Sequence, residues 1–104
     1  MINFAVMSNT IRSIRKMSRK RVDPEELCPD VMQELRQMQT ELSAMIDTLP
    51  NLSERIVMFL VFLEGHEHST VAEEMGISER SVFRHMKSGK AELLKMYPGR
   101  IVMS

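Results

Sequence analysis

Apolar residues recur at intervals of three and four along most of the chain, the spacing that places them on one face of an α-helix. No stretch alternates apolar and polar residues for long, so the pattern does not favour strands. Turn-forming residues are confined to a few points: Asp23-Pro24, Cys28-Pro29-Asp30, Leu49-Pro50-Asn51, Gly65, Gly76 and Pro98-Gly99. The sequence therefore predicts an all-α fold, a small helical bundle.

The predicted helix that opens at Asp30 carries a heptad-like seam. Asp30 is a favourable N-cap and Gln33 stands three residues further on, which is the spacing of a capping box. The apolar residues of the seam alternate intervals of four and three: Val31, Leu35, Met38, Leu42, Met45 and Leu49. About two and a half heptads are few for an autonomous coiled coil. We interpret residues 23–50 as a linking helix that either packs on its own domain or forms a homodimer.

Three more helices are predicted in residues 51–104. The first opens at Ser53 and is apolar nearly all round through residues 55–64, so it should occupy the centre of the core, and Gly65 ends it. A shorter helix covers roughly His68–Met75. Ser78 caps a last helix that runs to about Met96.

Two of these helices match a helix-turn-helix. A three-residue turn between short helices requires a steep crossing angle, so the residue at the closest approach must be small, as Ala72 is. The turn itself needs a positive φ, which Gly76 adopts without a steric penalty. Val82 would then insert into the first helix. The predicted core of the motif consists of Val71, Ala72, Met75, Gly76, Ile77 and Val82.

With Val82 buried, the opposite face of the last helix is suited to reading DNA. A recognition helix lies in the major groove, where its first turns meet base edges. Arginine bonds to guanine O6 and N7, glutamate accepts from cytosine N4, and an apolar side chain contacts the thymine methyl group. The base-reading candidates are Glu79, Arg80, Phe83 and Arg84, and the phosphate candidates on this element are Ser78, Ser81, Lys87 and Lys90.

Charge is balanced in total but segregated along the chain. There are 14 Lys and Arg against 14 Asp and Glu, yet all acids are absent from the first twenty-two residues, whereas residues 23–54 are strongly acidic. We expect residues 1–22 to be a basic arm that is mobile without DNA and adds phosphate or minor-groove contacts when DNA binds. The alternative is a helix docked on the core through Ile11, Ile14 and Met17. The phosphate candidates of this arm are Arg15, Lys16, Arg19, Lys20 and Arg21.

Composition excludes other classes of protein. Cys28 is the one cysteine, so an internal disulfide is impossible and a reducing cytoplasm is expected. No apolar run is long enough to suggest a membrane span. Phosphate-binding loops, paired carboxylates and metal-ligand spacings do not occur convincingly, so we expect no enzyme, no catalytic residue, no metal and no cofactor.

The stretch from Leu49 to Met96 resembles region 4 of sigma-70-type transcription factors. The matching features are Leu49-Pro50, the apolar helix ending in Glu64-Gly65, Val71-Ala72-Glu73, Gly76-Ile77-Ser78, Val82 and the basic tail of the last helix. The sequence is also similar to small phage late-gene activators of the RinA and ArpU type. The resemblance implies promoter DNA as partner, with Glu79, Arg80, Phe83, Arg84 and Lys87 on DNA-facing positions, and a module that can touch RNA polymerase.

Three functions remain open on this sequence. The first is a phage-derived, sequence-specific transcription regulator that binds double-stranded DNA in a bacterial cytoplasm. The second is a DNA-recognition subunit of a phage packaging machine, similar to a small terminase subunit. The third is a protein adaptor that binds RNA polymerase without DNA.

Overall fold

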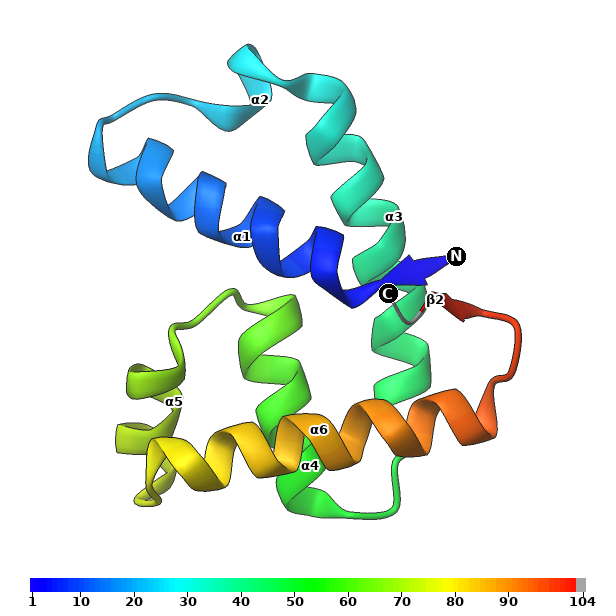
Figure 1. Ribbon diagram of the computed structural model, residues 1–104. Coiled ribbons are helices and arrows are strands. Elements are labelled where there is room, and N and C mark those ends of the chain that lie inside the picture. The colour runs from blue at the N-terminus through cyan, green and yellow to red at the C-terminus, as the bar shows by residue number, and fades with distance from the viewer. Residues whose placement is uncertain (103–104) are drawn as a thin grey trace.

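The computed structural model describes residues 1–102 and places six α-helices, one π-helical turn and two very short strands there (Figure 1). The helices are α1 (Phe4–Arg19), α2 (Pro24–Leu27), α3 (Pro29–Ile46), α4 (Leu52–Met58), the π-helical turn η1 (Phe59–Leu63), α5 (His68–Met75) and α6 (Glu79–Met96). The predicted all-α fold is confirmed. None of the helices in residues 1–102 is long and apolar enough to cross a membrane.

The strands β1 (Ile2–Asn3) and β2 (Ile101–Val102) join the two ends of the described chain. They pair in parallel, with Ile2 opposite Ile101, and the Ile2 amide also donates to the Arg100 carbonyl at 2.9 Å. Both isoleucines are buried. The helical spacing along the sequence did not predict this pairing, because two-residue strands are too short to show a period. The pairing fixes where α1 begins.

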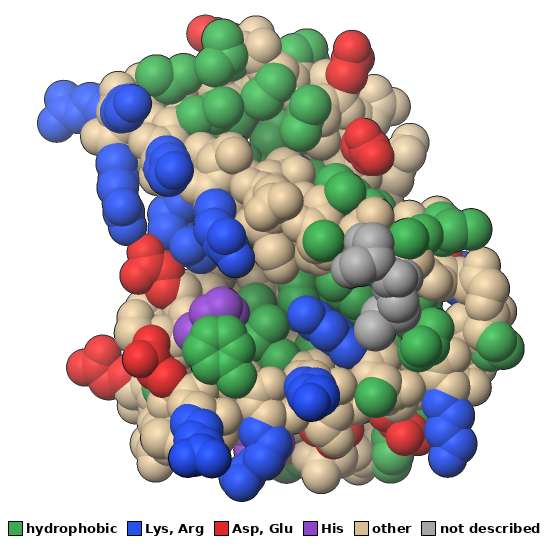
Figure 2. Space-filling model, in the orientation of Figure 1, with side chains coloured by type: hydrophobic (Ala, Val, Ile, Leu, Met, Phe, Trp, Pro, Cys, Tyr) green, Lys and Arg blue, Asp and Glu red, His purple; other side chains and the backbone are tan. Residues whose placement is uncertain are grey.

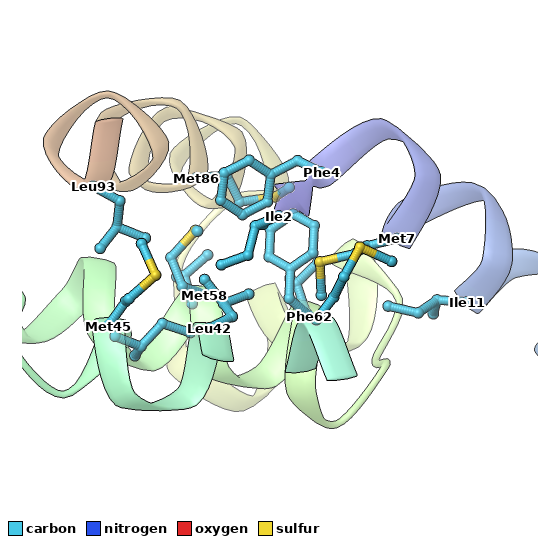
Figure 3. Packing of buried hydrophobic residues seen from close by; sticks show 14 of the residues in the cluster. Ile2, Phe4, Met7, Ile11, Leu42, Met45, Met58, Phe62, Met86 and Leu93 are labelled. Atoms are coloured by element: carbon cyan, nitrogen blue, oxygen red, sulfur yellow. The ribbon is translucent and has the colours of Figure 1, made fainter. Parts of the chain in front are cut away.

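Helix α1 is packed on the core, so the expectation of an arm that stays mobile without DNA is wrong. Its buried residues are Phe4, Met7 and Ile11, and Ile14 is partly buried against the same cluster. The Phe4 ring lies against Phe62 with centroids 5.0 Å apart (Figure 3). The alternative interpretation, a docked helix, describes α1 correctly, although docking starts nearer the N-terminus than Ile11. Lys16 is exposed, whereas Arg15, four residues after Ile11, is only partly exposed on the docked side of the helix.

The seam of α3 is used inside the chain. Leu35, Met38, Leu42, Met45 and Leu49 are all buried in the hydrophobic core, whereas Val31 at the start of the seam is 44% exposed. The seam therefore packs on its own domain, and a homodimer would need a different surface. The helix begins at Pro29 and not after Asp30, because proline suits the first helical position and Cys28 takes the N-cap.

The helix formed by α4 and η1 lies at the centre, as predicted, but it is not buried on every side. Val57, Met58, Val61 and Phe62 are buried, while Phe59 is 42% exposed. The inner residues meet α1, α3 and α6 at once (Figure 3). Gly65 follows with φ 73°, a conformation that ends the helix and redirects the chain into α5.

Helix α6 approaches α4 closely at Gly89. A Cβ at this position would lie 3.0 Å from Met58 Cγ, in a core where Met58 is fully buried. Beside this contact the buried Glu54 accepts a hydrogen bond from Ser88 Oγ. The close packing holds the long axis of α6 against the centre of the molecule and leaves its far side free.

Truncation of Met7 tests whether α1 belongs to the fold. Met7 is completely buried, so Met7→Ala should lower the free energy of unfolding by about 2–5 kcal/mol. Val6 is 40% exposed on the same helix, and Val6→Ala should cost less than about 1 kcal/mol. Urea denaturation of both variants gives the two values. Equal, small losses would mean that α1 does not pack as described.

Candidate nucleic-acid interface

The turn between α5 and α6 has the geometry of a helix-turn-helix. Gly76 ends α5 in the left-handed conformation, with φ 67° and ψ 34°. The Ile77 amide then donates to the Ala72 carbonyl at 3.0 Å, which closes the turn. Ser78 caps α6, since its hydroxyl oxygen accepts from the Ser81 amide at 3.1 Å. These contacts set the angle at which α6 leaves α5.

The predicted motif core lies where the two helices meet. Val71 and Val82 are completely buried and Ala72 is nearly so. Met75 and Ile77 are partly buried and pack against the same cluster. Burial of Val82 fixes which side of α6 faces solvent.

The four base-reading candidates are all exposed on the N-terminal half of α6: Glu79, Arg80, Phe83 and Arg84. Lys87 is exposed one turn further on. Phe83 is 52% exposed and its ring lies on the His68 ring, with centroids 4.4 Å apart. A side chain held in this way loses little rotamer freedom on binding, because its position is already fixed.

Lys90 is placed differently from the other cations of α6. Its Nζ lies 5.4 Å from the ring centroids of both Phe4 and Phe62, a cation–π arrangement at the boundary with α1. Partial burial lowers the pKa of Lys90. Lys90 therefore lies at the boundary with α1 and is only partly exposed, unlike Lys87, with which the sequence analysis grouped it as a phosphate candidate.

The cations of α1 fall into two groups. Arg15 donates to the Gly65 carbonyl at 2.6 Å, and Arg19 pairs with Glu67 at 2.8 Å, so both hold α1 to the segment before α5. The second group is exposed: Arg12 and Lys16 on α1, with Lys20 and Arg21 directly after the helix. Ser78 and Ser81 are engaged with each other at the start of α6.

Basic side chains of α1 and α6 gather on one face of the molecule (Figure 2). Lys and Arg side chains cover α1 in the upper left of the view and line α6 along the lower edge, with histidine side chains between the two groups. The sequence analysis named neither Arg12 nor His68 as a site residue, and both line the cleft between α1 and α6. The helical spacing of Ser8, Arg12 and Arg15 was the available signal for that side of α1.

Substitution of Gly76 tests the turn that sets the angle of α6. No heavy atom of another part of residues 1–102 lies within 4 Å of a Cβ built there, so the cost is that of the backbone conformation. Gly76→Ala should destabilise by about 1–2 kcal/mol, and Gly76→Asn by less, because asparagine tolerates the left-handed region. Thermal unfolding compares the two. A Gly76→Ala variant as stable as the parent would contradict the turn conformation.

Comparison with known proteins concerns the same part of the chain. The family model described as sigma-70, region 4 matches residues 39–93, which is more than half of the chain and covers the second half of α3 and all of α4 and α5. The match ends within α6 and leaves out α1. No curated protein and no solved structure gave a match. A sigma-70 region 4 domain is a DNA-binding helix-turn-helix associated with transcription, and this chain belongs to the sigma-70 region 4 family.

Proposed function

We propose that the protein is a sequence-specific, double-stranded DNA-binding regulator of transcription that reads its site with the first half of α6. The observation that carries the proposal is the exposed row Glu79, Arg80, Phe83 and Arg84, which we call the recognition row. It lies opposite the buried Val82 on a helix whose angle is fixed at Gly76. These side chains stand at the end of the helix that enters a major groove first.

Each residue of the row has a chemically distinct part. Arg80 and Arg84 donate paired hydrogen bonds to guanine O6 and N7, and Glu79 accepts from cytosine N4. Phe83 contacts a thymine methyl group. Lys87 pairs with a phosphate, as do the exposed cations Lys16 of α1 and Lys20 and Arg21 directly after it. Because α1 is docked, its cations reach DNA without the entropy cost of ordering an arm.

The proposal includes a contact with RNA polymerase, which an exposed apolar stripe on α4 and η1 supports. Leu52, Ile56 and Phe59 follow each other at intervals of four and three and are all exposed. A groove of about 700 Å³ beside the stripe runs between α3 and η1 and includes Phe59 and Leu63. Exposed apolar side chains on one helix face suit an amphipathic helix of a partner.

We also propose a phage origin, a cytoplasmic location and a non-enzymatic role, which rest on the resemblance to phage late-gene activators and on the exposed recognition row. The packaging-subunit and adaptor alternatives make different predictions. A packaging subunit forms a multi-copy assembly with an ATPase partner. An adaptor binds polymerase and shows no salt-sensitive binding to DNA.

Truncation of Arg84 tests the orientation of α6. The preferred sequence is first selected from random duplex DNA, and binding of Arg84→Ala to it is then measured. Loss of one arginine–guanine pair should weaken specific binding by about 1–3 kcal/mol and flatten the preference at one base position.

Lys87→Ala is the matched control, because it removes one exposed cation one turn further along the same helix. It should weaken all duplex sequences alike and reduce the slope of log affinity against log salt by about 0.9. If Arg84→Ala binds every duplex as the parent does, α6 does not enter the groove in the proposed orientation.

Substitution of Phe59 tests the polymerase contact. Phe59→Ser should abolish association with purified core RNA polymerase while leaving duplex binding unchanged, because the stripe lies on α4 and η1 and the recognition row on α6. Val6→Ser, an exposed apolar position on α1, is the control and should retain both activities. Co-sedimentation with the polymerase measures the first activity and electrophoretic mobility shift the second. If the parent, Phe59→Ser and Val6→Ser associate equally with polymerase, the apolar stripe on α4 and η1 is not the polymerase contact.

A further inference from the structure

Two neighbouring clefts between α1 and the helix-turn-helix share two of their lining residues. The first has a volume of about 420 Å³ and is lined on its α1 side by Ile11 and Arg15 and on its opposite side by His68 and Phe83. The second has a volume of about 300 Å³ and lies between Phe4, Ala5 and Asn9 of α1 and Lys90 of α6. Both clefts include Ser8 and Arg12. We call the combined depression the α1–α6 trough.

The trough concentrates positive charge at its middle. No carboxylate of residues 1–102 forms an ion pair with Arg12, which stands where the two clefts meet. Within that range the second cleft is lined by two cations, Arg12 and Lys90, and by no acid. Ser8 and Asn9 add hydrogen-bond donors there. The first cleft does contain acids, but Glu67 is already paired with Arg15 and Arg19, which leaves Glu79 at its margin.

The surroundings of His68 report the same excess of positive charge. Its pKa is lowered by burial first, and then by the charges of Arg12 and Arg15 on α1, while Lys90 on α6 acts in the same direction. Glu79 alone among these groups raises it. Partial burial also lowers the pKa of Lys90. The pKa values of two groups that line these clefts are thus lowered, and an anion between the two groups would raise both values.

We propose that the α1–α6 trough binds a phosphate group, with Arg12 and Lys90 as the charged ligands, Ser8 and Asn9 as neutral donors, and His68 as a third cation once the phosphate is present. The site lies partly on α1, which is outside the residues that match the sigma-70 region 4 model, so it is a property of this chain.

The position of the trough identifies DNA backbone as the source of the phosphate. It runs beside α6 and includes Phe83 of the recognition row. The walls of a major groove are the two phosphate backbones, so a strand bordering the groove that α6 enters passes next to that helix. This assignment rests on the proposed function. The alternative source, with the same chemistry, is a free phosphate compound.

The first experiment measures binding of Arg12→Gln to a duplex of unrelated sequence at several salt concentrations. Loss of one phosphate contact should reduce the slope of log affinity against log salt by about 0.9 and weaken binding about five- to ten-fold near 0.1 M salt. Arg12 is exposed, so the variant should keep the parent melting temperature. Arg36→Gln is the control: it removes one exposed charge of α3 that pairs with Glu25 and does not line the trough, and it should change neither the salt slope nor the affinity.

The second experiment follows His68 by NMR in the free protein, with inorganic phosphate and with the duplex. A bound phosphate favours the protonated ring, so the pKa of His68 should rise in the complex against the opposing charges of Arg12, Arg15 and Lys90 and with the help of Glu79. Binding then takes up a proton, and affinity increases as the pH falls from about 8 to about 6. His68→Gln should remove this increase.

The results distinguish a failure of the phosphate site from a failure of the proposed DNA-binding function. A smaller salt slope for Arg12→Gln, together with a raised His68 pKa in the duplex complex, supports a DNA phosphate in the trough. Saturable binding of inorganic phosphate that Arg12→Gln abolishes supports the site with a free phosphate as its source, even in a protein that binds no DNA. If Arg12→Gln behaves like Arg36→Gln with both probes, the trough binds no phosphate and the inference is wrong.

Discussion

Burial of the helix formed by α4 and η1 is the interaction on which the other elements depend. A helix-turn-helix of two short helices encloses too little apolar surface to be stable alone, so α5 and α6 need a third partner. Met58 and Phe62 supply it from the centre of the core, where they meet α6, α3 and α1. Gly89 lets the backbone of α6 come close enough for Met58 to be fully enclosed. The direction of the recognition row thus follows from packing at the opposite side of the same helix.

Docking of α1 turns a charged segment into part of a fixed surface. Phe4, Met7 and Ile11 anchor it by burial, while Arg15 and Arg19 hold its far end to Gly65 and Glu67. A helix held in this way presents its remaining cations in one geometry. A flexible basic arm would lose conformational entropy whenever it bound, whereas α1 has already lost that entropy in folding.

Local sequence patterns predicted much of the fold because the bounds of a helix depend on residues close to each other in the chain. The bounds of α5 and α6 follow from Gly76 and Ser78, whose roles depend on residues within one turn. The placement of α1 was predicted wrongly because the six cations of residues 12–21 outweighed Phe4 and Met7, which continue the spacing of Ile11 towards the N-terminus. The pairing of Ile2 with Ile101 and the proximity of Arg12 to His68 join positions far apart in the chain, and no local period encodes them.

Contacts between distant parts of the chain also determine how the charges act on a DNA partner. A net charge of zero gives little attraction at long range, since the acids of residues 23–54 offset the cations elsewhere. What remains is the separation of the two signs, which orients the molecule in the field of a polyanion. Such an orienting effect requires the basic groups to keep fixed positions relative to the recognition row. Packing of α1 supplies that rigidity, so in the proposed complex with DNA the apolar face of α1 contributes to recognition through buried side chains that do not contact DNA.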